Sequence, residues 1–114
     1  NIKFLPIMLK TSIKEGFYFM GIQVLKVSGN SNANSISRAI IEYVLKDSIV
    51  NIDSIGIKAS YAATKALIKA TEFLVEHGYS FRLRPYYIKV DTLTQEHNTI
   101  PKTAIRWTLI AEKK

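Results

Sequence analysis

The chain has 114 residues, the size of one small domain, and 47% of them are hydrophobic, which is enough to build a core. It contains no cysteine, which excludes disulfide frameworks, cysteine zinc sites and thiol catalysis. Sixteen basic and nine acidic residues give a net charge of +7, which favours polyanionic partners such as RNA or DNA. No apolar run approaches the ~20 residues that cross a bilayer, and we expect no membrane partner.

Residues 1–20 are interpreted as an N-terminal extension that precedes a domain at residues 21–114. The extension is rich in large apolar side chains and carries three lysines against one glutamate, without arginine. This composition is compatible with the remainder of an organelle-targeting segment. It is also compatible with an assembly arm, the interpretation that we predict, because so many apolar side chains suit a covered surface better than a solvated tail. The sequence leaves both interpretations open.

From Gly21 the pattern predicts a short strand, which ends in a polar run at residues 28–32 that is typical of a turn. A helix follows, and we expect Asn34 or Ser35 to cap its N-terminus. Its apolar positions recur at i, i+3, i+4, i+7 and i+8 and so form one face. These positions are Ile36, Ala39, Ile40, Tyr43 and Val44.

Residues 49–58 predict a second strand, and residues from about 60 to 77 predict a second helix. Gly78 is the expected left-handed residue after that helix. One stripe of the helix is mainly alanine, which indicates that a sheet packs closely against it. The stripe consists of Ala59, Ala62, Ala63, Ala66, Leu67, Ala70 and Leu74.

Alternating apolar and polar residues predict a third strand at residues 79–90 and a fourth at residues 103–111, on either side of a polar loop at residues 91–102. This arrangement is typical of a long β-hairpin. Pro85 places the third strand at a sheet edge or bends it there. The element order β-α-β-α-β-β predicts an α/β fold, a two-layer sandwich of one sheet and two helices.

The sequence offers no catalytic constellation, so we expect a protein that is not an enzyme and that holds no cofactor and no metal. His77 and His97 lack a metal-binding partner at i, i+4, and the five glycines form neither GxGxxG nor a P-loop. The loop at residues 28–32 lies between a strand and a helix, where phosphate binders occur. A phosphate contact at this helix N-terminus and a plain capping loop fit the sequence equally well.

Arg82 and Arg84 fall on one face of the third strand, and the partner strand of the hairpin is expected to place Arg106 beside them. Guanidinium groups ~7 Å apart match the spacing of phosphates along a nucleic-acid backbone. Tyr86 and Tyr87 interleave with these cations and are candidates for stacking on bases or ribose. The alternative is a solvated face whose tyrosines fill the edge of the core.

The basic excess lies at the two ends, because residues 1–48 carry six basic and three acidic groups and residues 79–114 carry seven and three. We predict mainly phosphate contacts, which are salt-dependent and nearly blind to sequence, with RNA favoured over DNA. The predicted contact residues are Lys26, Ser28, Asn30, Ser31, Asn32, Asn34, Lys58, Arg82, Arg84, Lys89, Lys102 and Arg106.

Short runs of the chain resemble the stage V sporulation protein S family. VLKVS at residues 24–28 and NSI at residues 34–36 are similar to the start of that domain, and Pro85 matches the proline of its third strand. The resemblance covers about residues 22–112 in register. Further matching positions are Ile55, Gly56, Ala59, Ala63, Lys65, Ala66, Phe73, Leu74, Thr103, Ala104, Ile105 and Arg106.

The family belongs to the Alba-like group of β-α-β-α-β-β proteins, so the resemblance implies a small, basic, usually dimeric nucleic-acid binder. The sequence departs from the family at Ala33, usually proline, at Lys58, usually glycine, and at Tyr61, usually asparagine. If the junction at residue 58 is a tight turn, Lys58 must accept a geometry that glycine takes freely. Residues 1–20 have no counterpart in the family.

These observations lead to three candidate functions with unequal support. The first is a non-enzymatic nucleic-acid-binding module, as a homodimer or with protein partners. The second is a structural subunit of a large ribonucleoprotein, such as an organellar (mitochondrial) ribosome, which the apolar and basic extension motivates. We expect an intracellular location, with the mitochondrial or another organelle matrix as the finer expectation. A hydrolase or transferase built on the loop at residues 28–32 has the least support.

Overall fold

The computed structural model describes residues 21–114, so the predicted extension at residues 1–20 lies outside the described residues. The predicted element order β-α-β-α-β-β is confirmed. The elements are β1 (Gly21–Val27), α2 (Ala33–Leu45), β2 (Ser48–Ser54), α3 (Ile57–Glu76), β3 (Tyr79–Leu93) and β4 (Thr99–Lys113).

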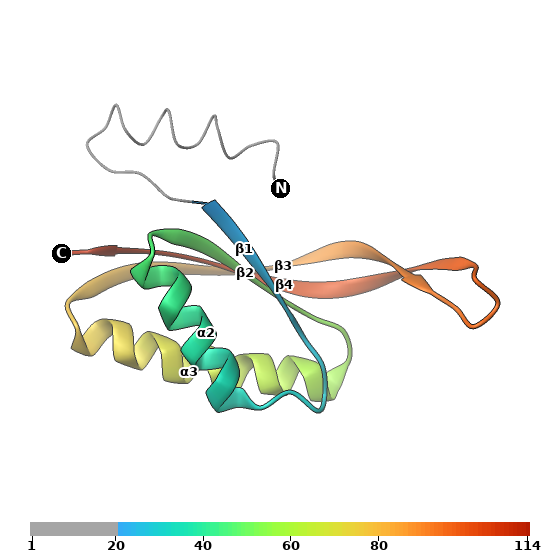
Figure 1. Cartoon of the computed structure of the whole chain (residues 1–114), viewed down its shortest axis with the longest axis horizontal. Coiled ribbons are helices and arrows are strands. Elements are labelled where there is room, and N and C mark those ends of the chain that lie inside the picture. The colour runs from blue at the N-terminus through green and yellow to red at the C-terminus, as the bar shows by residue number, and fades with distance from the viewer. Residues whose placement is uncertain (1–20) are drawn as a thin grey trace.

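The four strands form one mixed sheet in the order β1-β2-β4-β3. β1 runs parallel to β2, and β4 pairs antiparallel with both β2 and β3. Both helices cover the same face of this sheet, and the far half of the β3–β4 hairpin projects beyond them (Figure 1). The chain is therefore the predicted two-layer sandwich. β3 is an edge strand, the first of the two alternatives for Pro85, and an edge position tolerates a residue without an amide hydrogen.

The core lies between the helices and the sheet. Ile40 of α2 and Val50, Ile52 and Leu109 of the sheet are fully buried. The alanine stripe of α3 packs on them, as predicted, because its small side chains let the helix approach closely. All of its members are buried: Ala59, Ala62, Ala63, Ala66, Leu67, Ala70 and Leu74.

The cap of α2 differs from the prediction. The cap is Asn32, not Asn34 or Ser35: its side-chain Oδ1 accepts hydrogen bonds from the backbone amides of Asn34 and Ser35 at 2.8 and 3.1 Å. One extended asparagine thus satisfies two orphan amides, and the helix begins at Ala33.

The junction between β2 and α3 also differs from the prediction. The strand ends at Ser54 and the helix begins at Ile57, whereas the sequence predicted a strand to residue 58 and a helix from about residue 60. Gly56 between them has φ 88° and ψ 168°, which glycine adopts freely. Lys58 therefore lies in the first turn of α3 with helical geometry, and the special backbone position is Gly56. Gly78 has φ 80°, which confirms the left-handed residue after α3.

The hairpin is longer than predicted. β3 continues to Leu93 and β4 starts at Thr99, so the loop is confined to residues 94–98 instead of residues 91–102. The register is continuous from the pair Tyr79–Lys113 to the pair Leu93–Thr99. Pro101 is tolerated inside β4 because β2 has ended there and β3 is the remaining neighbour.

Candidate nucleic-acid interface

The register of the hairpin fixes which cations share a face. Arg82 and Arg84 lie opposite Ile110 and Thr108, and Arg106 lies opposite Tyr86. Because opposed residues share a face and alternate positions such as Leu83 pack on the core, all three arginines lie on the sheet face turned away from α2 and α3. We call this the outer face. The expectation that Arg82, Arg84 and Arg106 share one face is confirmed.

Arg82 and Arg84 present free guanidinium groups on the outer face. Both side chains are exposed, and neither has a carboxylate within ion-pair distance in the part of the chain that the structure describes. Together with Tyr86, Thr108 and Ile110 they line a shallow groove of about 290 Å³. The guanidinium carbon of Arg84 lies 5.0 Å from the centroid of the Tyr86 ring, which helps to orient it.

Arg106 is held differently, by a two-pronged ion pair with Asp53 of β2. Its Nε and Nη2 donate to the two carboxylate oxygens at 2.7 and 2.8 Å, and the two side chains are 24% and 9% exposed. Hydrogen bonding to Asp53 raises the pKa of Arg106 above its ordinary value. The carboxylate occupies the fork with which an arginine would hold a phosphate. Arg106 therefore braces β4 against β2.

The two tyrosines, equivalent in the sequence pattern, have different environments. The Tyr86 hydroxyl lies 2.7 Å from Oγ1 of Thr108, which in turn donates to Oδ1 of Asn51 at 2.6 Å. Tyr86 is thus fixed within a polar chain on the outer face. Tyr87 points to the opposite face and is 77% exposed, so it is the tyrosine of this pair that is free to stack on a base.

The loop between β1 and α2 is closed by its own hydrogen bonds. The Ser28 amide donates to Oγ of Ser31 at 2.9 Å, and the Ser31 amide donates to the Ser28 carbonyl at 3.1 Å. The cap at Asn32 uses two further amides. Of the two interpretations of this loop, the geometry favours the capping loop, and a phosphate would meet exposed side chains such as Asn30 instead of a cradle of amides.

Two predicted cations adjoin this loop. A Cβ added to Gly29 would lie 2.9 Å from the Cβ of Lys58, so the loop packs directly against the first turn of α3. Lys26 lies on β1, two residues before Ser28, where the loop begins. The fold therefore brings Lys26, Lys58 and the loop together from three elements.

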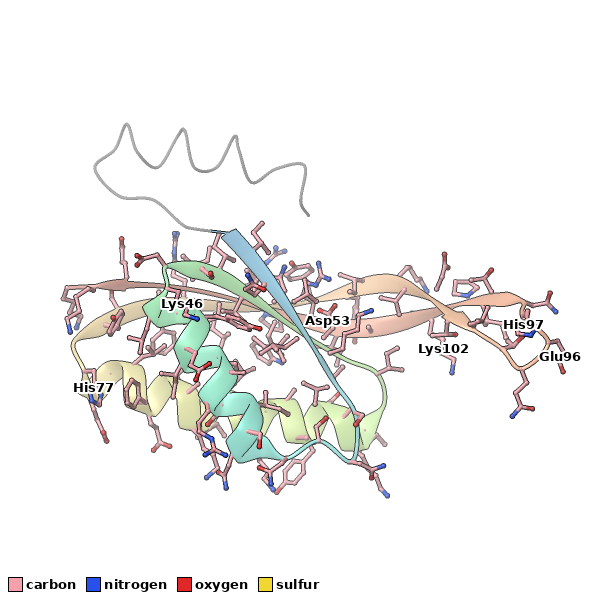
Figure 2. The ribbon with its side chains drawn as sticks, viewed as in Figure 1. Lys46, Asp53, His77, Glu96, His97 and Lys102 are labelled. Carbon is pink, nitrogen blue, oxygen red and sulfur yellow. The ribbon has the colours of Figure 1, made fainter. Side chains whose placement is uncertain are left out.

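Lys89 and Lys102 extend the basic surface along the projecting hairpin. Lys102 lies on the outer face opposite Val90, and Figure 2 shows it well separated from Asp53 along the hairpin. Lys89 lies on the other face, where its Nζ donates to Oγ1 of Thr103 at 2.7 Å. The predicted cations thus occupy both faces of the hairpin instead of one row.

An apolar groove of about 400 Å³ near the start of α3 was not predicted. It is lined by residues that include Ile57, Tyr87 and Ile105. Ile57 is 90% exposed, an unusual state for a large aliphatic side chain. No sequence pattern pointed to the groove, because the alternation around Ile57 predicts a strand that continues through it.

Within residues 21–114, neither helix is long and apolar enough to cross a membrane. The same residues hold no group of three side chains suited to bind a metal ion. His77 packs at the end of α3: its ring stacks on the Phe73 ring with the centroids 3.9 Å apart, and its Nδ1 lies 2.8 Å from the Phe73 carbonyl.

Residues 23–112 match the model of the family described as Stage V sporulation protein S. No curated protein matches the sequence. Among solved structures, the chain is similar to a precorrin-6y C5,15-methyltransferase from Geobacter metallireducens, at 15% identity and a TM-score of 0.36. That similarity covers 80% of this chain and 44% of the other, and it is too slight to support an argument about fold or function.

Proposed function

The chain belongs to the stage V sporulation protein S family, and from this premise we propose that it is a non-enzymatic protein that binds nucleic-acid phosphates. The observation that carries the proposal is the pair Arg82 and Arg84, exposed beside a groove on an edge strand and free of carboxylate partners within residues 21–114. Hydrogen bonds from guanidinium to phosphate are charge-assisted and strong, and two such groups on one strand reach neighbouring phosphates.

A second contact region is the loop at residues 28–32 with its flanking cations Lys26 and Lys58. These side chains come from β1 and α3, so a backbone lying along the loop meets positive charge from both sides. Lys89 and Lys102 continue the positive charge onto the hairpin. We place Arg106 outside the contact set, because Asp53 already occupies its guanidinium.

RNA is the proposed nucleic acid. Tyr87 offers an exposed ring on a projecting strand, and unpaired bases stack on rings of this kind. A duplex keeps its bases stacked inside, so it would contact only the basic side chains of the protein and would not stack on Tyr87. Fluorescence anisotropy with a single-stranded RNA of about 20 nucleotides, its DNA equivalent and a DNA duplex, between about 50 and 200 mM salt, tests the proposal. We expect binding to weaken steeply with salt and to be tightest for the RNA. Binding that is insensitive to salt would contradict the proposal.

A second candidate function is a structural subunit of a large ribonucleoprotein, as in an organellar, for example mitochondrial, ribosome. The observation that favours it is the groove lined by Ile57 and Tyr87, which are 90% and 77% exposed. Large apolar side chains this exposed suit burial against protein. In this candidate the protein is held by RNA on its basic surface and by a protein partner, or a second copy, at the groove.

Removing residues 1–20 separates the two candidates. We expect the truncated chain, residues 21–114, to remain folded, because the alanine stripe and the sheet already form a core. If the protein is a subunit of a ribonucleoprotein, we also expect the truncated chain to be absent from the high-mass complex that the full chain forms in its native extract. Sedimentation of both chains, with and without nuclease, measures this. A truncated chain that aggregates or melts far lower would show that residues 1–20 belong to the domain's own core.

A further inference from the structure

A cleft of about 380 Å³ lies where β1 and β2 end and the hairpin continues. Its lining comes from all four strands and from the start of the β1–α2 loop. Open α/β sheets bind ligands at the carboxyl ends of their parallel strands, and β1 and β2 are the parallel pair of this sheet. The volume falls within the range of roughly 300–1,000 Å³ that is typical of small-molecule sites.

The apolar part of the lining is made by Val27, Ile55, Val90 and Ala104. These side chains come from β1, from the end of β2 and from both hairpin strands. In β3 the half-buried residues are odd-numbered before Pro85 and even-numbered after it. Even-numbered residues lie on the outer face, so Val90 is one of the half-buried residues of that face. An apolar surface of this kind accepts a flat hydrophobic group such as a base.

Most polar groups of the cleft already have partners. Asp53 is paired with Arg106, and Ser54 lies 3.2 Å from the hydroxyl of Ser60. Lys26 remains, because its side chain forms no hydrogen bond or ion pair within residues 21–114. It lies beside Asp53 in the β1–β2 register and so shares the outer face with Val90, which gives the cleft one free cation on that face.

We propose that the cleft holds one nucleoside monophosphate unit, an inference that rests on the proposed binding of RNA. The base lies on the apolar lining, and the phosphate contacts Lys26. The position agrees with this assignment, because the cleft lies between the loop at residue 28 and the hairpin cation Lys102, which is opposite Val90. An unpaired strand that contacts both regions passes over the cleft.

Val90→Phe fills the cleft and tests the proposal, with Ile100→Phe as its matched control. Both residues lie on the outer face of the hairpin, but only Val90 lines the cleft. Thermal melts of both variants establish that each is folded. We expect Val90→Phe to weaken binding of single-stranded RNA about tenfold, the effect of losing one stacked base, whereas Ile100→Phe does not. Both variants should bind an abasic ribose-phosphate oligomer as the wild type does.

Lys26→Ala supplies a second measurement that is independent of cleft filling. We expect it to weaken binding of the single-stranded RNA and of the abasic oligomer alike, and to flatten the slope of log affinity against log salt by about 0.7, the change for one phosphate on a single strand. Equal RNA binding by Val90→Phe and the wild type, with an unchanged slope in Lys26→Ala, would overturn the cleft and leave the proposed function standing.

Titration with adenosine monophosphate tests whether the cleft binds a free nucleotide as well as a nucleotide within a strand. If no oligomer binds the wild type, the proposed function fails. Binding of the mononucleotide that Val90→Phe abolishes would then still support the cleft as a nucleotide site. Absence of mononucleotide binding in that case would overturn both.

Discussion

Replacing Asp53 with alanine is expected to lower the free energy of unfolding by about 2–4 kcal/mol, because the guanidinium of Arg106 then loses both of its hydrogen bonds. Removing one partner of a buried ion pair leaves the other charge desolvated without compensation. The loss is smaller than for a wholly buried pair, since Arg106 keeps 24% of its side-chain exposure. Thermal unfolding measures it, with a fall in melting temperature of about 10–20 °C.

The double variant Asp53→Ala with Arg106→Met is the matched control. It removes both charges, and replacing a buried pair with apolar side chains is often neutral. We therefore expect the double variant to recover most of the stability that Asp53→Ala loses. Hydrogen bonding to Asp53 raises the pKa of Arg106, so the guanidinium stays cationic throughout the pH range in which proteins are handled. A single variant within about 0.5 kcal/mol of the wild type would show that the pair does not brace the sheet.

The fold was predictable where one element carried a long, regular pattern. The stripe from Ala59 to Leu74 predicted a helix packed closely on a sheet, and all of its members are buried. The boundary of that helix was not predictable, because the propensities of Ile55 and Ile57 favour a strand. The positive φ of Gly56 ends the strand. Ile57 then enters the first turn of α3 with its side chain 90% exposed, because the stripe buried from Ala59 onward requires a helix whatever the preference of Ile57.

The candidate site was predictable only as a set of cations. Alternation placed Arg82, Arg84 and Arg106 on one face, and the register confirms it. Which of these arginines lacks a carboxylate partner depends on the pairing of β2 with β4. That pairing sets Asp53 opposite Arg106, and no local sequence pattern reveals it because the two residues lie far apart in the chain. The capping of α2 by Asn32 likewise follows from the closed loop before it, which periodicity does not describe.

Tyr86 and Tyr87 show the same limit for aromatic residues. As neighbours in a strand they must point to opposite faces, and no local pattern indicates which face holds a partner. The structure supplies Thr108 for Tyr86 and leaves Tyr87 exposed. Similarly, the polar composition around Asp91 predicts a loop, and its place in the cleft depends on the extra length of β3.

The double variant Arg82→Ala with Arg84→Ala is expected to weaken binding to every nucleic acid tested, by about tenfold for each phosphate that is no longer bound, because hydrogen bonds to charged groups contribute about 1.5 kcal/mol or more. The slope of log affinity against log salt should also flatten. For each phosphate that is no longer neutralised, the slope changes by about 0.9 on duplex DNA and by about 0.7 on a single strand. Fluorescence anisotropy across a salt series measures both quantities on the same samples.

The matched control removes the same two charges elsewhere. Lys65→Ala with Lys69→Ala lowers the net charge equally, but these exposed side chains lie on α3, on the helix side of the sheet. If phosphates lie along the outer face at Arg82 and Arg84, the arginine variant binds more weakly and its affinity depends less steeply on salt. The lysine variant then keeps nearly the wild-type affinity and salt dependence. Equal losses in the two variants would reduce the interaction to net charge and remove the hairpin groove from the binding site. Because Arg82 and Arg84 take no part in the core or in the pair at Asp53, unchanged melting of both variants is expected, and the comparison then reports on binding alone.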